Sequence, residues 1–206
     1  MDTSVELVKH LLQSVVYIHT TVGKEHPSTR ILGNERLGSG VVVDASGLIL
    51  TVNYVVMGGQ TIYVAFQKGR RVKAELVAQV FEVGLALIRV KRDGLVAAEL
   101  APADTVERCD EVVLLGTMGP QERRVTGGLV TYIGEYEAYW EYLLDRSIVS
   151  NAPNPGYGGG GLFTMTGRLA GTVALNLNEI ARSSLAIPGD LFRTHRDATL
   201  RSRRVV

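Results

Sequence analysis

The chain has 206 residues, of which 46% are hydrophobic and 21% charged, and its formal net charge is +1. This length suffices for one substantial domain or two closely packed small ones, and with so balanced a charge no global field favours nucleic acid or an anionic membrane. A single cysteine, Cys109, excludes an internal disulfide framework.

The first residues predict a short amphipathic helix. Thr3 and Glu6 have the spacing of a capping box, and Val5, Val8 and Leu11 fall on one face. The helical period then ends, and short β-rich runs follow one another, several of them separated by turn residues. They occupy residues 14–20, 40–44, 48–51, 61–66, 72–80, 85–90, 111–117, 125–133, 146–150, 168–176 and 183–188. Such a series of short strands predicts an all-β barrel or sandwich.

The strands are numerous enough for two barrels of about six strands each, joined near residues 95–105. We expect the helix and the first barrel in residues 1–100 and the second barrel in residues 101–190. Residues 191–206 predict a helical or disordered tail rich in arginine. Its arginines are Arg193, Arg196, Arg201, Arg203 and Arg204.

The N-terminus has no basic region followed by an apolar core and a cleavage site, so it does not resemble a signal peptide. No stretch approaches the roughly 18–20 apolar residues that span a bilayer. We therefore expect a cytoplasmic protein without membrane contact. Paired cysteines and the HxxxH and HExxH patterns are absent from the sequence, so we expect neither a metal nor a cofactor.

Four segments, taken together, resemble the HtrA (Deg) family of trypsin-fold serine proteases. Residues 38–56 resemble the family's GSG-led hairpin that ends in TNxHVV, and residues 83–88 resemble its TDLAVL segment. Residues 154–162 resemble NPGNSGGPL, and residues 185–188 resemble FAIP. The segments occur in the family's order and cover roughly residues 4–195. The resemblance implies a chymotrypsin-type double β-barrel, and the chain leaves no room for the PDZ domain that usually follows.

The chain departs from the family pattern at each catalytic position. The resemblance assigns Tyr54 to the position of the general-base histidine, Gly84 to that of the orienting aspartate, and Gly158 to that of the nucleophilic serine. Tyrosine, with an ordinary pKa of about 10, is a poor base at neutral pH, and glycine supplies neither a nucleophile nor a carboxylate. No histidine lies between residues 27 and 194. We therefore expect no catalytic residue.

The segment around Gly158 leaves two structural questions open. The resemblance implies that the main-chain amides of Gly156 and Gly158 form a nest like an oxyanion hole, whereas the glycine run 158–161 also permits a loose loop that holds nothing. Tyr157 either fills the vacant catalytic position with its ring or lies exposed to solvent. Ser39, Ser150 and Cys109 have no evident base beside them.

The leading hypothesis is therefore a catalytically inactive, HtrA-like pseudoprotease. It would bind proteins or extended peptide segments as a scaffolding or regulatory subunit of a homo- or hetero-oligomer. One alternative is a residual or non-standard hydrolase that uses Tyr54 and Tyr157 or a group from a partner chain. A second alternative is binding of nucleic acid or an acidic partner through the arginine-rich tail.

Overall fold

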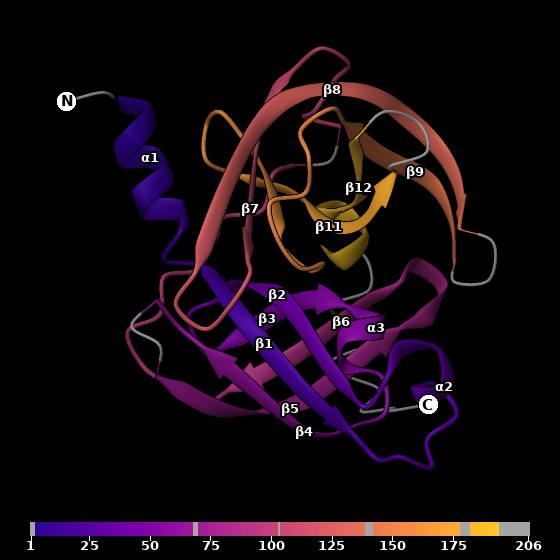
Figure 1. Cartoon of the computed structure of the whole chain (residues 1–206). Helices are drawn as coiled ribbons and strands as arrows, with labels where there is room; N and C mark the ends of the chain where they lie inside the picture. The colour runs from indigo at the N-terminus through magenta and orange to yellow at the C-terminus, as the bar shows by residue number, and fades with distance from the viewer. Residues whose placement is uncertain (1–2, 68–69, 103, 139–141, 178–181, 194–206) are drawn as a thin grey trace.

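Runs of valine, leucine and isoleucine form the strands of two closed antiparallel barrels, each with six strands (Figure 1). The computed structural model describes residues 3–67, 70–102, 104–138, 142–177 and 182–193. β-Branched and aliphatic side chains suit a pleated surface that packs on one or both faces. In β3 (Leu48–Val52) all five residues are buried, which places this strand at the centre of the fold.

The first barrel has the strand order β1-β2-β3-β6-β5-β4. Its other strands are β1 (Val15–Val22), β2 (Glu35–Asp44), β4 (Gly59–Ala65), β5 (Arg71–Val80) and β6 (Leu85–Val90). Three short helices interrupt them, namely α2 (Thr29–Leu32), α3 (Asn53–Val56) and the 3-10 helix η1 (Phe81–Val83). Both α3 and η1 sit at strand ends, so each can present a residue at the rim of the barrel.

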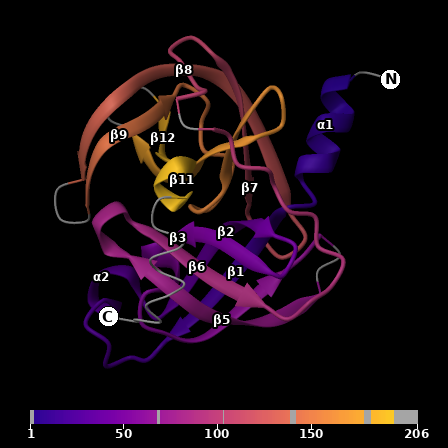
Figure 2. The same ribbon diagram turned by 180° about the vertical axis from the view of Figure 1, so that it is seen from behind.

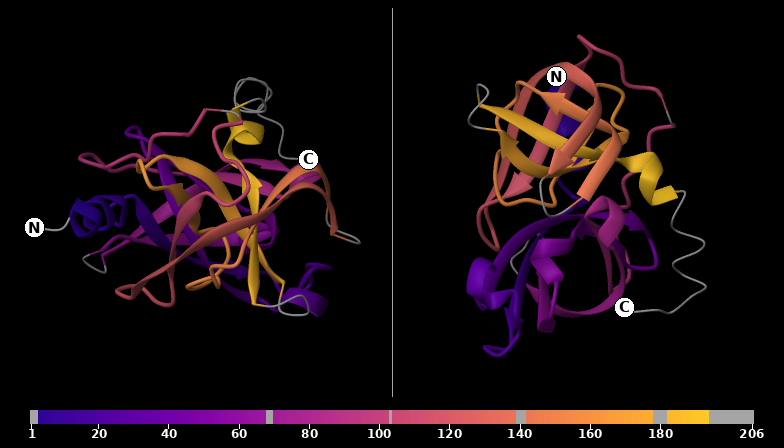
Figure 3. Two further views of the ribbon diagram at one scale, coloured as in Figure 1. Left: turned by 90° about the horizontal axis from the view of Figure 1, so that it is seen from above. Right: turned by 90° about the vertical axis from the view of Figure 1, so that its right-hand side faces the viewer.

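The second barrel has the strand order β10-β11-β12-β9-β8-β7. Its strands are β7 (Glu111–Thr117), β8 (Arg123–Ala138), β9 (Tyr142–Ser150), β10 (Gly161–Thr164), β11 (Leu169–Leu177) and β12 (Ser183–Pro188). The 16-residue β8 arches over this barrel and ends in a hairpin with β9. Figure 3 shows one barrel stacked on the other in its right-hand view.

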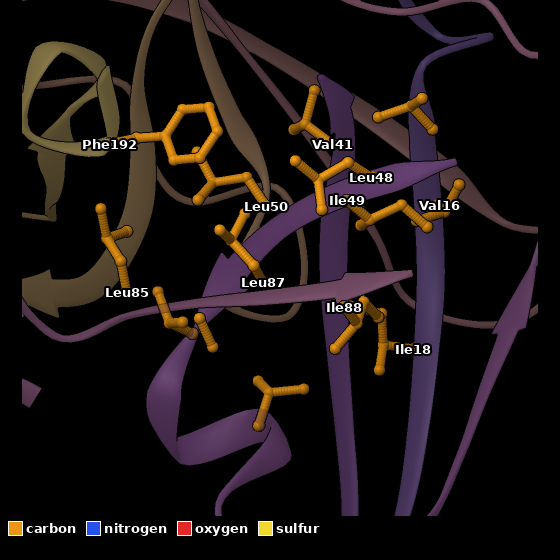
Figure 4. Packing of buried hydrophobic residues seen from close by; sticks show 14 of the residues in the cluster. Val16, Ile18, Val41, Leu48, Ile49, Leu50, Leu85, Leu87, Ile88 and Phe192 are labelled. Atoms are coloured by element: carbon orange, nitrogen blue, oxygen red, sulfur yellow. The ribbon is translucent and has the colours of Figure 1, made fainter. Parts of the chain in front are cut away.

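Each end of the described chain packs against the barrel to which it does not belong. Helix α1 (Thr3–Leu11) precedes the first barrel, yet a Cβ atom built at Gly167, in the β10–β11 turn, would lie 2.8 Å from Leu7 Cδ1. The helical residues 189–193 follow β12 and lie where the barrels meet (Figure 2). From there Phe192 points toward the first-barrel core beside Leu50 and is 4% exposed (Figure 4).

A half-buried arginine also joins the two barrels. Arg123, at the start of β8, donates from Nε to Val15 O at 3.2 Å and from Nη2 to Ala65 O at 2.9 Å, both in the first barrel. Its Nη1 donates to Pro120 O at 3.1 Å. Burial lowers the pKa of the Arg123 guanidinium from its ordinary value. The three carbonyls replace the water that the guanidinium loses.

The predicted all-β double barrel with a short N-terminal helix is confirmed. Three strands or hairpins differ most from the prediction: β2 begins at Glu35 and not at residue 40, β10 was not predicted and begins within the glycine run, and the β8–β9 hairpin extends beyond residues 125–133 and 146–150. The predicted tail falls outside the described residues beyond Arg193. None of the described helices has the length and apolar character needed to cross a membrane.

Candidate active-site cleft

Tyr54 occupies the single turn of α3, directly after the buried strand β3. Its hydroxyl donates a hydrogen bond of 2.8 Å to the carbonyl oxygen of Ala174 on β11. The side chain therefore extends from the first barrel to the second. This bond directs the phenol ring into the junction between the barrels and away from solvent.

Arg36 fixes the backbone that carries Tyr54. Its Nη1 donates to Tyr54 O at 2.9 Å and to Met57 O at 2.7 Å, which are carbonyls at the end of α3. The side chain is 5% exposed, and burial lowers the pKa of its guanidinium. A short helix leaves its last carbonyls without intrahelical partners, and Arg36 supplies the missing donors. Sequence analysis did not identify Arg36, because its acceptors are distant main-chain oxygens.

Gly158 lies directly beside the Tyr54 hydroxyl. A Cβ atom built at Gly158 would lie 1.7 Å from Tyr54 Oη and 2.9 Å from its Cζ. Real Cβ atoms do not approach other heavy atoms this closely. The volume in which a side chain at position 158 would begin is thus filled by the tyrosine hydroxyl.

Gly84 is the left-handed C-cap residue of η1, with φ +73°. Its carbonyl oxygen accepts a hydrogen bond of 2.9 Å from the amide of Asn53, the first residue of α3. The structure therefore brings the three positions together around α3: Gly84 contacts its first residue, and Gly158 contacts Tyr54. Their roles as former catalytic positions stay predictions from the resemblance.

The glycine run 158–161 is tightly packed between the barrels. A Cβ atom at Gly159 would lie 2.1 Å from Ser39 O, and one at Gly160 would lie 2.3 Å from Leu115 O. The Gly159 amide donates to Val173 O at 2.7 Å, and Gly158 O accepts from the Ser39 amide at 2.8 Å. Glycine is required here because backbone from both barrels approaches closely. The alternative of a loose loop does not fit these contacts.

One of the two main-chain amides in the expected nest, that of Gly156, already donates a hydrogen bond. The Gly156 amide donates to Asn154 Oδ1 at 3.1 Å, within its own loop. An incoming carbonyl oxygen would have to displace this side chain before using that amide. The nest therefore stays a prediction, and its first donor is not free in this conformation.

Ser39, considered in the sequence as a stray hydroxyl, is completely buried and holds the loop to both barrels. Its Oγ donates to Tyr157 O at 2.8 Å and accepts from the Thr117 amide at 2.9 Å. The carbonyl of Ser39 accepts from Thr51 Oγ1 at 2.7 Å. This hydroxyl links three segments and is unavailable as a nucleophile.

The ring of Tyr157 lies against Tyr17 of β1. The ring centroids are 6.4 Å apart and the planes are tilted by 52°. Burial, together with the neighbouring Tyr157, raises the pKa of Tyr17 above its ordinary value. Occlusion of the cleft by Tyr157 stays a prediction, whereas the group that contacts Gly158 is Tyr54.

One histidine lies near α3 but has a packing role. The ring of His26 would contact a Cβ atom at Gly58, with its Nε2 at 2.6 Å, and its Nδ1 is 2.6 Å from Ser28 Oγ. Arg36 Nη2 donates to the same Ser28 oxygen. The guanidinium engages one lone pair of that oxygen, and the Ser28 amide donates to His26 Nδ1 at 3.3 Å. Ser28 and His26 therefore belong to a local network that anchors the loop before β2.

Two stacked six-stranded barrels with a candidate cleft at their junction define the class of trypsin-like peptidase domains. Residues 38–171 match the family model described as "Trypsin-like peptidase domain". The chain belongs to this family and, within it, to the HtrA/Deg-like group, as the resemblance implied.

Relatives among curated proteins are bacterial serine proteases. A probable periplasmic serine protease do/HhoA-like of Haemophilus influenzae is 33% identical over 138 residues, which is 66% of this chain and 30% of the relative. A probable periplasmic serine endoprotease DegP-like of Hahella chejuensis is 32% identical over 163 residues, covering 75% of this chain and 33% of the relative. The chain thus spans about a third of the length of these relatives.

Solved structures agree with the fold over nearly the whole chain. A variant of the HtrA-type protease AlgW with a tripeptide superposes with a TM-score of 0.85 at 25% identity. The match covers 99% of this chain and 65% of that one. AlgW with a decapeptide gives a TM-score of 0.82 and, at 23% identity, supports the fold alone.

The prediction of a cytoplasmic protein is wrong. The relatives are periplasmic proteases by name, including the periplasmic serine endoprotease DegP of Salmonella typhimurium, which is 32% identical over 137 residues. The prediction rested on the absence of a leader sequence, and such an absence does not identify a compartment.

Proposed function

We propose that this chain is a catalytically inactive HtrA-like protein that binds other proteins through extended segments and acts as a scaffolding or regulatory subunit. The observation that carries the loss of catalysis is the contact between Tyr54 and Gly158. The tyrosine hydroxyl takes the volume of a side chain at position 158 and is itself hydrogen bonded to Ala174 O. Gly158 has no side-chain atom that could attack a substrate, and the tyrosine hydroxyl leaves no volume for such an atom.

Two further observations support an inactive cleft. The hydroxyl of Ser39 and the imidazole of His26 are held in buried or local hydrogen bonds, so neither replaces a missing catalytic group. The Gly156 amide is bonded to Asn154 Oδ1, which removes one donor from a site that would stabilise an oxyanion.

Binding of polypeptide is supported by the integrity of the framework. Arg36, Ser39 and Arg123 keep the loop and both barrels in fixed positions although the side chains for catalysis are missing. The related AlgW structures contain a tripeptide or a decapeptide. Pairing of an extended segment with strand edges uses main-chain groups and needs no catalytic residue.

The test is a joint cleavage and binding experiment with unfolded casein and a peptide library. Mass spectrometry of new termini measures cleavage, and fluorescence anisotropy of labelled casein measures binding. The Tyr54→Ala, Tyr157→Ala double variant and heat-inactivated protein are controls. We expect saturable binding and no new termini above the heat-inactivated sample. Cleavage that disappears in the double variant would establish a tyrosine-dependent hydrolase, and the absence of both cleavage and binding would overturn the binding role.

A further inference from the structure

A basic surface covers the outside of the first barrel where β4, β5 and β6 come together. Its exposed or partly exposed cations are Arg70, Arg71, Lys73, Arg89, Lys91 and Arg92. The pairing register holds them close, because Arg71 lies opposite Ala65 and Arg89 lies opposite Glu75 on neighbouring strands. Arg92 stacks over the ring of Phe66, directly after β4, at 4.2 Å.

This basic surface has an aromatic side chain within it and few acids. Tyr63 lies opposite Lys73 in the β4–β5 ladder, so both side chains point outward, and Tyr63 is 38% exposed. Glu75 is 3.8 Å from Lys91, and both side chains are largely exposed. This carboxylate offsets one of the six cations, so the surface keeps a net positive charge. It places one exposed aromatic ring beside a group of cations, and aromatic and arginine side chains are enriched at protein-binding surfaces.

The β8–β9 hairpin carries the opposite charge, because its exposed side chains include three carboxylates beside a leucine. Glu137 lies opposite Leu143 in the ladder, so these side chains share one face of the hairpin. Glu135 and Asp145 follow on the same two strands, next to a register shift between Gly134 and Tyr136. All four residues are exposed, and Leu143 is 60% exposed. Within the described part of the chain, none of these three carboxylates forms an ion pair.

The two surfaces lie on opposite sides of the molecule. The ends of β4 and β5 are at the left of Figure 1, whereas β8 and β9 meet at the right, and the views in Figure 2 and Figure 3 agree. They therefore do not meet within one chain. Contact between opposite sides of identical molecules is heterologous and gives a ring or an open filament.

We propose that the β8–β9 hairpin of one copy docks on the basic surface of a second copy. Leu143 packs on Tyr63, while Glu135, Glu137 and Asp145 meet the cations of β5 and β6. Complementary charges accelerate such an encounter and fix its direction, and the apolar pair adds a contact from which water is excluded. This association is independent of whether the cleft at Tyr54 turns over a substrate.

Sedimentation velocity of the full chain, from about 2 to about 200 µM, measures this association over the range of weak protein affinities. We expect a sedimentation coefficient that rises with concentration at about 50 mM salt, with at least about tenfold weaker association at about 0.5 M. The Arg71→Glu, Lys73→Glu variant and the Glu135→Lys, Glu137→Lys variant should each sediment as monomers. An equimolar mixture of the two should associate again, because each then offers a complement to the other.

Two charge-reversal variants away from these surfaces serve as controls. Glu107→Lys, Glu111→Lys changes the charge of the second barrel equally, and Lys24→Glu, Arg30→Glu changes that of the first. Both should associate like the unmodified chain. Circular dichroism establishes that every variant is folded. A monomeric unmodified chain throughout the concentration range, or association that survives either reversal, would overturn the proposal, as would a mixture that fails to associate.

Discussion

Tyr54 and Gly158 form a complementary pair across the barrel junction: the tyrosine hydroxyl lies 1.7 Å from the point where a Cβ atom of residue 158 would stand. Either residue therefore restricts the other. A tyrosine at position 54 in this conformation excludes every residue that has a Cβ atom from position 158. The two residues therefore form one structural unit.

Gly158→Ala should destabilise the protein strongly in the presence of Tyr54. Overpacking of this kind costs about 1–3 kcal/mol of unfolding free energy, since the ring must move from its hydrogen bond with Ala174. In the Tyr54→Ala background the same change should cost much less. Urea unfolding of the four proteins in a double-mutant cycle measures the coupling. Additive effects would show that the tyrosine side chain has another position available.

Gly84→Ala should lower the unfolding free energy by about 1–2 kcal/mol, because Gly84 has φ +73° and alanine disfavours the left-handed region. Gly84→Asn should cost less, since asparagine visits this region more readily. Gly119→Ala is the matched control: its φ is not left-handed, and its nearest neighbour would be Glu122 Cβ at 4.0 Å. Equal losses for Gly84→Ala and Gly84→Asn would contradict backbone strain as the cause.

Arg123→Ala should cost about 1.5–3 kcal/mol of unfolding free energy, because three partly buried carbonyls would lose a charged donor. The neighbouring Arg124→Ala should cost less than about 0.5 kcal/mol, since its ion pair with Glu122 is about half exposed. Thermal and urea unfolding compare the two. A loss for Arg123→Ala as small as that for Arg124→Ala would mean that Arg123 does not fasten the barrels.

Stability should fall as the pH rises above about 10. Burial, with the adjacent Tyr157, raises the pKa of Tyr17 in the folded protein above the unfolded value of about 10. Above that pH the unfolded chain releases the proton while the folded chain retains it, so unfolding is favoured. The urea midpoint measured from pH 8 to 11 should decline less steeply in Tyr17→Phe than in Tyr63→Phe. Tyr63 is the control because it is 38% exposed. Identical slopes would contradict a role for Tyr17.

The sequence was sufficient to predict those strands that are marked by hydrophobic periodicity and by turn residues at their ends. Strands such as β3 and β6 were predicted from continuous aliphatic runs. Strand β10 was not, because Gly161 at its start belongs to a glycine run that is typical of loops. The longer β8–β9 hairpin was missed because acids and aromatics there obscure the alternation of a half-buried strand.

The candidate site was predicted by residue positions but not by its contacts. The motifs identified Tyr54, Gly84 and Gly158 as positions of interest. They did not predict that the Tyr54 hydroxyl fills the volume beside Gly158, because this depends on the direction of the tyrosine side chain. The roles of Arg36 and Arg123 were not predictable, because each satisfies main-chain carbonyls from segments far apart in the chain. Hydrogen bonds to the backbone leave no pattern in side-chain types.

The exchange of chain ends between the barrels has a mechanical consequence. Helix α1 rests on the second barrel at Gly167, and Phe192 is inserted into the core of the first. Tension applied to the two ends would load the contacts between the barrels before it separated any strand from its sheet. Both barrels should therefore unfold together in a single step under mechanical load. Cleavage of the connection between the barrels near residue 95 should leave the two fragments associated.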